Sequence, residues 1–210
     1  MSVALTVGGA VIFRITENMP WIGALFNSVT ARTAGFSTYS LGEFSNAGLL
    51  AMIFLMFVGA SPGSTGGGIK TSTLFALIQG IKTAATNTSG KAFHYSVPHG
   101  VFRKASVIAV MGISVIAVGT FMLCAFEPDI AIRDALFEMT SAFGTVGLTT
   151  GITTGLCTAS KLTSIVMMYI GRLGPLTIAT LWYFTNGDRI KYPDGNIAIC
   201  LLYTSPSPRD

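Results

Sequence analysis

The sequence predicts an all-α membrane protein in which units of membrane helix, pore loop and membrane helix are repeated and arranged pseudo-fourfold around an ion pore. Three observations predict this fold class. Half of the 210 residues are hydrophobic and only 10% are charged, whereas a soluble domain carries about 25% charged residues. Long apolar segments alternate with helical segments too short to cross a bilayer. A TxGxxT motif follows two of the short segments.

Two segments are long and apolar enough to span a membrane. Residues 105–126 contain no charged side chain, and residues 162–184 contain only Arg172. About 20 apolar residues cross the hydrocarbon core as a helix, so both are predicted membrane helices. Residues 2–15 are apolar but shorter, and we expect them to be the end of a helix that begins upstream. They lack the basic start and cleavage site of a secretory signal.

A further apolar segment is interrupted. Residues 45–60 lead into the glycines of GASPGSTGGGIKTST, and residues 73–81 resume the apolar pattern. Proline and clustered glycines break helices, so we predict a discontinuous helix with a loop in the membrane. The loop resembles a phosphate-binding loop, but that motif needs lysine directly after the last glycine and a preceding strand. Ile69 separates Gly68 from Lys70, which argues against a nucleotide-binding enzyme.

The charges between the spans predict the orientation. Residues 82–104 carry basic side chains and no acidic one, whereas residues 127–161 carry four acidic and two basic ones. By the positive-inside rule the first connection is cytoplasmic, the second faces outward, and the tail returns to the cytoplasm. His94 and His99 are interpreted as solvated loop residues, because no carboxylate lies near them to complete a metal site. The net charge of +4 is dispersed along the chain, which argues against nucleic-acid binding.

The chain contains an internal repeat with a spacing of 112 residues. The aligned segments are 33–38 with 145–150 and, in the same register, 56–59 with 168–171. In each copy a short amphipathic segment, 21–32 or 132–143, comes before the TxGxxT turn. About three helical turns cannot span a bilayer, and irregular backbone is tolerated there only where it is buried in protein or lines water. Each segment is therefore a predicted re-entrant pore helix.

The turns supply the chemistry of a cation site. A pore helix directs the partial negative charge of its C-terminus towards the turn, which favours a cation. Backbone carbonyls can replace the hydration shell of an alkali ion, and glycine permits the backbone conformation that this requires. A fourfold ring needs four copies. Either two chains assemble around one pore, or two further copies lie upstream, as the shortened first helix favours.

Four motifs together resemble a known family: NSVTARTAGFST, MFVGASPGSTGGGIKTST, SAFGTVGLTTGIT and YIGRLGPLT. They are similar to the third and fourth pore repeats of the Trk/Ktr/HKT superfamily of potassium transporters, most closely its membrane (TrkH/KtrB-like) subunit. The resemblance extends to about Tyr192. It implies four repeats around one pore in a complete chain, and a dimer of two such chains. This sequence then corresponds to the C-terminal half.

The resemblance implies this division: a third-type repeat (1–84), a cytoplasmic basic loop (85–104), a fourth-type repeat (105–187) and a cytoplasmic tail (188–210). The final LLYTSPSPRD is polar and irregular. Two interpretations of it stay open, a disordered end or a foreign sequence appended to a truncated chain.

The resemblance also implies roles for three groups of residues. A selectivity filter replaces the hydration shell of K⁺ with main-chain oxygens; one glycine per repeat implies weaker discrimination against Na⁺ than in tetrameric potassium channels. An intramembrane loop acts as the gate, and Arg172 adds an electrostatic barrier below the filter. From the residues alone, a salt bridge between Arg172 and Glu138 is the alternative, because a guanidinium in a membrane needs a partner or a wet cavity. The implied filter positions are Thr33, Ala34, Gly35, Phe36, Thr145, Val146, Gly147 and Leu148, and the gate comprises Gly63, Ser64, Thr65, Gly66, Gly67, Gly68 and Lys70.

The expected partners follow from the same resemblance. They are membrane lipid, a second copy of the chain, and a cytoplasmic nucleotide-binding regulatory subunit (TrkA/KtrA-like) for which the basic residues 91–104 are a candidate docking surface. K⁺ is the expected transported ion, with no organic cofactor, and the bacterial inner membrane is the expected location. The alternative is a secondary ion-coupled transporter with broken midplane helices, which inverted repeats would favour. The two copies here share one orientation. No catalytic constellation indicates an enzyme.

Overall fold

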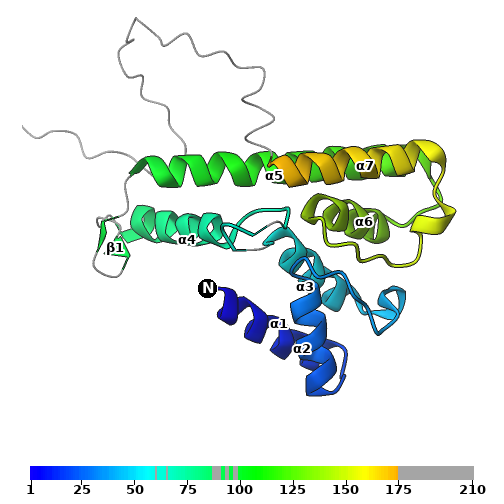
Figure 1. The fold of residues 1–210 in the computed structure, drawn as a ribbon, viewed down its shortest axis with the longest axis horizontal. Helices are drawn as coiled ribbons and strands as arrows, with labels where there is room; N and C mark the ends of the chain where they lie inside the picture. The colour runs from blue at the N-terminus through cyan, green and yellow to red at the C-terminus, as the bar shows by residue number, and fades with distance from the viewer. Residues whose placement is uncertain (60, 65, 87–90, 93–94, 97–98, 175–210) are drawn as a thin grey trace, which may run out of the picture.

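The computed structural model describes residues 1–174 except 60, 65, 87–90, 93–94 and 97–98, and this part of the chain is mainly helical (Figure 1). The helices are α1 (Ser2–Thr16), α2 (Trp21–Thr30), α3 (Asn46–Phe57), α4 (Thr71–Thr86), α5 (His99–Phe126), α6 (Ile132–Gly144) and α7 (Thr158–Leu173). Two 3-10 turns, η1 (Leu41–Glu43) and η2 (Thr153–Gly155), follow the TxGxxT motifs. The two-residue strands β1 (Lys91–Ala92) and β2 (Tyr95–Ser96) pair antiparallel between α4 and α5.

Helix α5 contains the predicted membrane helix 105–126 and begins six residues earlier, at His99. Its segment Val101–Phe126 is the one helix in the described part of the chain that is long and apolar enough to cross a membrane. The shorter apolar helices are Ser2–Thr16 and Asn46–Phe57. Helices α2 and α6 coincide closely with the two predicted pore helices.

The predicted discontinuous helix is present as α3 and α4, which are separated by residues 58–70. The N–H of Ile69 donates to the carbonyl of Phe57 at 3.0 Å. Val58 and Ile69 also form a parallel bridge, so the chain returns to the end of α3 before α4 begins. The interruption is therefore a closed loop anchored at its base.

The prediction of a continuous helix over 162–184 is wrong in the described part of the chain. Helix α7 begins earlier, at Thr158, and ends at Leu173. Gly174 adopts a φ of +87°, which ends a helix, and Pro175 follows it in the sequence. Arg172 thus lies in the last turn of α7 rather than near the centre of a long span.

The helices pack into two neighbouring groups. Helix α1 contacts α2 and α3, whereas α5 contacts α4, α6 and α7, and α3 joins the groups by packing on α6. Figure 1 shows α5 and α7 side by side with α6 beneath them. The hydrophobic core around α1–α3 also includes Phe137, Val146 and Leu148 from the second group. The second TxGxxT turn is therefore part of the contact between the groups.

Several expectations lie outside the described residues. These are the gate residue Thr65, the loop residue His94, the end of the second predicted span from 175 onward, and the tail 188–210.

Candidate functional site

The two TxGxxT turns share an unusual backbone. We call residues 33–36 the first turn and residues 145–148 the second turn. Thr33 and Thr145 have φ values of 71° and 52°, and Gly35 and Gly147 have φ values of 78° and 91°. A left-handed conformation costs a residue with a side chain about 1–2 kcal/mol. Two threonines at matching positions bear this cost, which points to a backbone held for function rather than for stability.

The pore helices hold each turn at their C-terminal ends. In the first turn, the N–H groups of Ala34 and Gly35 both donate to the carbonyl of Thr30 at 3.2 Å. In the second turn, the N–H of Thr145 donates to Ala142 and that of Val146 to Ser141, each at 3.0 Å. The negative ends of two helix dipoles therefore face the two turns, an arrangement that attracts a cation.

The two turns lie against each other. A Cβ atom at Gly35 would overlap the carbonyl oxygen of Val146, so only glycine fits there. A Cβ at Gly147 would meet nothing within 4 Å. Phe36 is 72% exposed, whereas Val146 and Leu148 are 5% and 3% exposed. The second turn is thus packed and the first is open on one side.

Different side chains support the turns from behind. In the first, the hydroxyl of Thr30 donates to the carbonyl of Phe36 at 2.5 Å. In the second, the carboxylate of Glu138, 8% exposed, accepts hydrogen bonds from the hydroxyls of Thr149 and Thr153. Glu138 makes no ion pair with Arg172 in the described part of the chain, and this disfavours the salt-bridge alternative. The sequence did not identify Glu138 as a support of the turn.

The glycine loop, residues 61–70, lies beside the second turn. The N–H of Gly67 donates to Oγ1 of Thr145 at 2.8 Å. Lys70 Nζ donates to the carbonyls of Ser64 at 3.3 Å and Gly66 at 2.5 Å. Gly63 and Gly68 have φ values of +85° and +73°, so residues with side chains would be strained there.

These contacts argue against a phosphate cradle among the described residues of the loop. Such a cradle needs free backbone N–H groups and a lysine that can reach the phosphates. The N–H groups of Gly66, Gly67 and Ile69 already have acceptors, and Lys70 binds the loop itself.

Arg172 is exposed in the last turn of α7, next to a close helix contact. A Cβ atom at Gly171 would overlap the carbonyl oxygen of Phe143, near the end of α6. The backbone of α7 therefore touches the end of the second pore helix just before Arg172. In the described part of the chain Arg172 takes part in no ion pair.

A second arginine, Arg32, was missed by the sequence analysis. Its guanidinium donates to the carbonyl of Ser2 at 2.9 Å, to the hydroxyl of Thr6 at 3.2 Å and to the carbonyl of Gly59 at 3.4 Å. It ties the end of α2 to α1 and to Gly59, which lies shortly before the glycine loop. The available signal was a charge directly before TAG in an apolar region, since charges at membrane depth are rare and functional.

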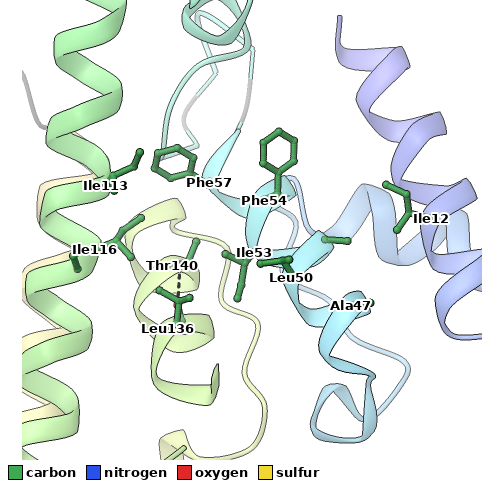
Figure 2. A pocket seen from close by; sticks show the side chains of 12 residues that line it. Ile12, Ala47, Leu50, Ile53, Phe54, Phe57, Ile113, Ile116, Leu136 and Thr140 are labelled. Atoms are coloured by element: carbon green, nitrogen blue, oxygen red, sulfur yellow. Dashed lines mark hydrogen bonds between the residues drawn. The ribbon is translucent and has the colours of Figure 1, made fainter. Parts of the chain in front are cut away.

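The described residues also enclose an apolar groove of about 820 Å³ between α1, α3, α5 and α6 (Figure 2). Ile12, Leu50, Phe54, Ile113 and Leu136 are among its lining residues. Its one polar side chain, Thr140, donates to the carbonyl of Leu136 at 2.7 Å. No group of three or more potential metal-ligating side chains occurs in the described part of the chain. The groove therefore offers less polar chemistry than the two turns.

Comparison with known proteins places the chain in a family. Residues 2–189 match the family TrkH, described as a cation transport protein. The chain is 36% identical over 173 residues to Ktr system potassium uptake protein B of Bacillus subtilis, covering 82% of this chain and 39% of that protein. It is 37% identical over 184 residues to the protein of the same name from Vibrio alginolyticus, covering 87% and 40%.

A third relative is the potassium/sodium uptake protein NtpJ of Enterococcus hirae, 35% identical over 213 residues, with 93% of this chain and 47% of that protein covered. The chain thus spans less than half the length of these relatives. Its fold resembles the crystal structure of the potassium transporter TrkH from Vibrio parahaemolyticus, with a TM-score of 0.69 and 22% identity over 87% of this chain and 42% of that one.

Proposed function

Because the chain belongs to the TrkH family of cation transport proteins, we propose that it forms part of a membrane pore for potassium uptake. In this proposal the two turns line a selectivity filter whose backbone carbonyls replace water around K⁺. The filter residues are Thr33, Ala34, Gly35, Phe36, Thr145, Val146, Gly147 and Leu148.

One observation carries the proposal: two turns of matching backbone lie against each other, each at the C-terminal end of a short helix. The positive φ values recur at Thr33 and Thr145 and at Gly35 and Gly147. Chance does not readily explain why strained threonines recur at a spacing of 112 residues. Related proteins are named as potassium uptake proteins, which supports potassium as the ion.

A complete filter needs more than two turns. The relatives are more than twice as long as the matched region, so we infer that two further repeats complete a pseudo-fourfold ring in the working transporter. The division into repeats at residues 1–84 and 105–187 belongs to this inference, as do multi-pass insertion and the location in a bacterial inner membrane.

The glycine loop is the gate of the proposed pore, and Arg172 is the barrier charge below the filter. The loop is rich in glycine and contacts the second turn through Gly67. Small residues let it approach the filter closely and also let it move away. A guanidinium near the pathway repels a passing cation and lowers its flux.

The proposed partners are a second copy of the chain and a cytoplasmic nucleotide-binding subunit. The naming of relatives as members of a Ktr system supports a multi-component assembly. Of the basic residues of 91–104, Lys91 lies in β1, and Arg103 and Lys104 lie near the start of α5. They suit a docking surface on the cytoplasmic side.

Potassium uptake is the direct test. The full-length protein is expressed in bacteria that lack their own potassium uptake systems, and growth at low K⁺ and Rb⁺ influx are measured. We expect both to be restored. Normal expression in the membrane without any K⁺ or Rb⁺ influx would reject the proposal.

Deletion of residues 63–70 tests the gate. A gate holds flux back, so its loss leaves a higher and unregulated flux through a complete pore. Loss of all flux in a protein that still folds and inserts would show instead that the loop builds the pathway.

A further inference from the structure

The hydrogen bond between the glycine loop and the second turn joins parts of the chain that are 78 residues apart. Gly67 is buried, and a Cβ atom there would lie 2.9 Å from both Oγ1 and Cγ2 of Thr145 and 3.0 Å from the carbonyl oxygen of Phe143. The loop backbone thus lies directly on the second turn, with no room for a side chain between them.

The other hydrogen bonds of the described loop residues stay within the first half of the chain. Lys70 donates to Ser64 and Gly66, and Ile69 donates to Phe57 at the end of α3. The hydroxyls of Ser2 and Ser61 share a hydrogen bond of 2.9 Å. In the described residues, therefore, the bond from Gly67 to Thr145 is the one hydrogen bond that holds the loop to the second turn.

The first turn lacks an equivalent contact. Thr33 occupies the position that matches Thr145, yet its hydroxyl makes no hydrogen bond among the described residues. Near the base of the loop, its Cγ2 lies 3.7 Å from the position that a Cβ on Gly59 would take. The contact therefore depends on the site and not only on the residue type, and Thr33 provides a matched control.

The hydroxyl oxygen of Thr145 can interact with two positively charged or partially positive partners, the N–H of Gly67 and a cation. A threonine hydroxyl carries two lone pairs, and the N–H of Gly67 occupies one of them. A cation at the turn would be drawn to the same oxygen and would repel the partially positive N–H hydrogen. Cation and loop therefore oppose each other at this atom.

We propose that Thr145 Oγ1 is a latch between filter and gate: it holds the glycine loop through Gly67, and a cation arriving at the second turn releases it. This rests on the proposed function, because it takes the second turn as a cation site and the loop as a gate. It makes Thr145 a positioning residue for the gate, and potassium itself the signal that frees the loop.

The experiment measures hydrogen–deuterium exchange of the loop in the full-length protein in lipid, at low and at high K⁺. The variants are Thr145→Val, which keeps the shape and removes the acceptor, Thr145→Ser, which keeps the hydroxyl, and Thr33→Val as the matched control. Rb⁺ influx of the same proteins in vesicles is measured in parallel.

We expect Thr145→Val to exchange about two- to tenfold faster than the wild type at residues 66–69, as the loss of one hydrogen bond implies. Thr145→Ser should stay near the wild type, and Thr33→Val should not speed the loop. High K⁺ should accelerate exchange in the wild type but not in Thr145→Val. Both valine variants lose one filter hydroxyl, so greater influx through Thr145→Val than through Thr33→Val reports on the latch.

Equal exchange in Thr145→Val and wild type would overturn the latch, as would equal acceleration in Thr33→Val. If Thr145→Val does not fold, the wild type still decides, because exchange insensitive to K⁺ contradicts release by the cation. Absence of Rb⁺ influx in the wild type would instead reject the proposed function. Hydrogen–deuterium exchange of the loop decides only whether the latch exists.

Discussion

The two units of the chain, residues 1–86 and 99–174, match in backbone at a spacing of 112 residues but differ in the side chains around the turns. Left-handed threonines, positive-φ glycines and 3-10 turns recur in register. So do the helix caps: Ser45 accepts from the N–H of Gly48 at 3.1 Å, and Cys157 accepts from that of Ser160 at 3.5 Å.

The two units differ in the helix that follows each turn and in the side chains that support it. In the first unit α3 ends at Phe57 before the glycine loop, whereas in the second unit α7 continues to Leu173. The first turn is supported by Thr30 and the second by Glu138. A shared backbone with different supports indicates one chemical task at the turns and separate tasks around them.

The largest difference between the two units is predicted for substitutions of the filter glycines. Gly35→Ala meets both the left-handed strain and the carbonyl of Val146, which together cost about 2–5 kcal/mol. Gly147→Ala has open space and meets only the strain, about 1–2 kcal/mol. Gly35→Ala should lower both the rate of K⁺ influx and the thermal unfolding temperature more than Gly147→Ala does. Equal losses would mean that the two turns do not touch in the working protein.

The two arginines separate a barrier from a structural tie. Arg172→Ala should raise potassium flux or change its apparent affinity with little effect on folding, because Arg172 is exposed and unpaired among the described residues. Arg32→Ala should destabilise the protein by about 1–3 kcal/mol, since it leaves the oxygens of Ser2, Thr6 and Gly59 without their donor. Uptake kinetics and thermal unfolding distinguish the two. Unchanged uptake in Arg172→Ala would remove its assigned role.

Glu138 tests whether the second turn depends on its own support. Glu138→Leu leaves the hydroxyls of Thr149 and Thr153 without their acceptor, at a cost of about 1–3 kcal/mol. We expect a weaker preference for K⁺ over Na⁺, measured by competition of Na⁺ with Rb⁺ influx. Glu138→Gln keeps an acceptor of similar shape and is the control. A leucine variant with wild-type competition would show that the turn keeps its shape without this support.

The smallest effect is expected at two carboxylates that join the end of one helix to the start of another. Glu17 accepts from the backbone N–H of Ser45 at 3.2 Å and from its hydroxyl at 2.6 Å. Glu127 accepts from the N–H of Cys157 at 2.6 Å. Each substitution by alanine should cost about 1 kcal/mol, with the larger loss at Glu17 because it makes more bonds. Thermal unfolding of the two variants checks the order, and a larger loss at Glu127 would contradict it.

Much of the fold could be predicted from local patterns. Helix α5, the two short pore helices and the interruption between α3 and α4 follow from apolar length and from glycine and proline, which act within a few residues. The end of α7 was predicted incorrectly because apolar content outweighed Gly174 and Pro175, although a glycine–proline pair marks a probable break. Arg32 and Glu138 were assigned no supporting role at the turns, since their partners come from other elements.

By itself, the sequence determined the repeated units, the positions of the turns and the family, because repetition, hydropathy and glycine placement are local properties of the chain. Only the tertiary structure decided that the two turns touch, that Lys70 closes its own loop, and that Thr145 rather than Thr33 receives Gly67. Two identical residues in matching backbones differ in this way because the approach of a loop from elsewhere in the chain depends on packing, which no local pattern encodes.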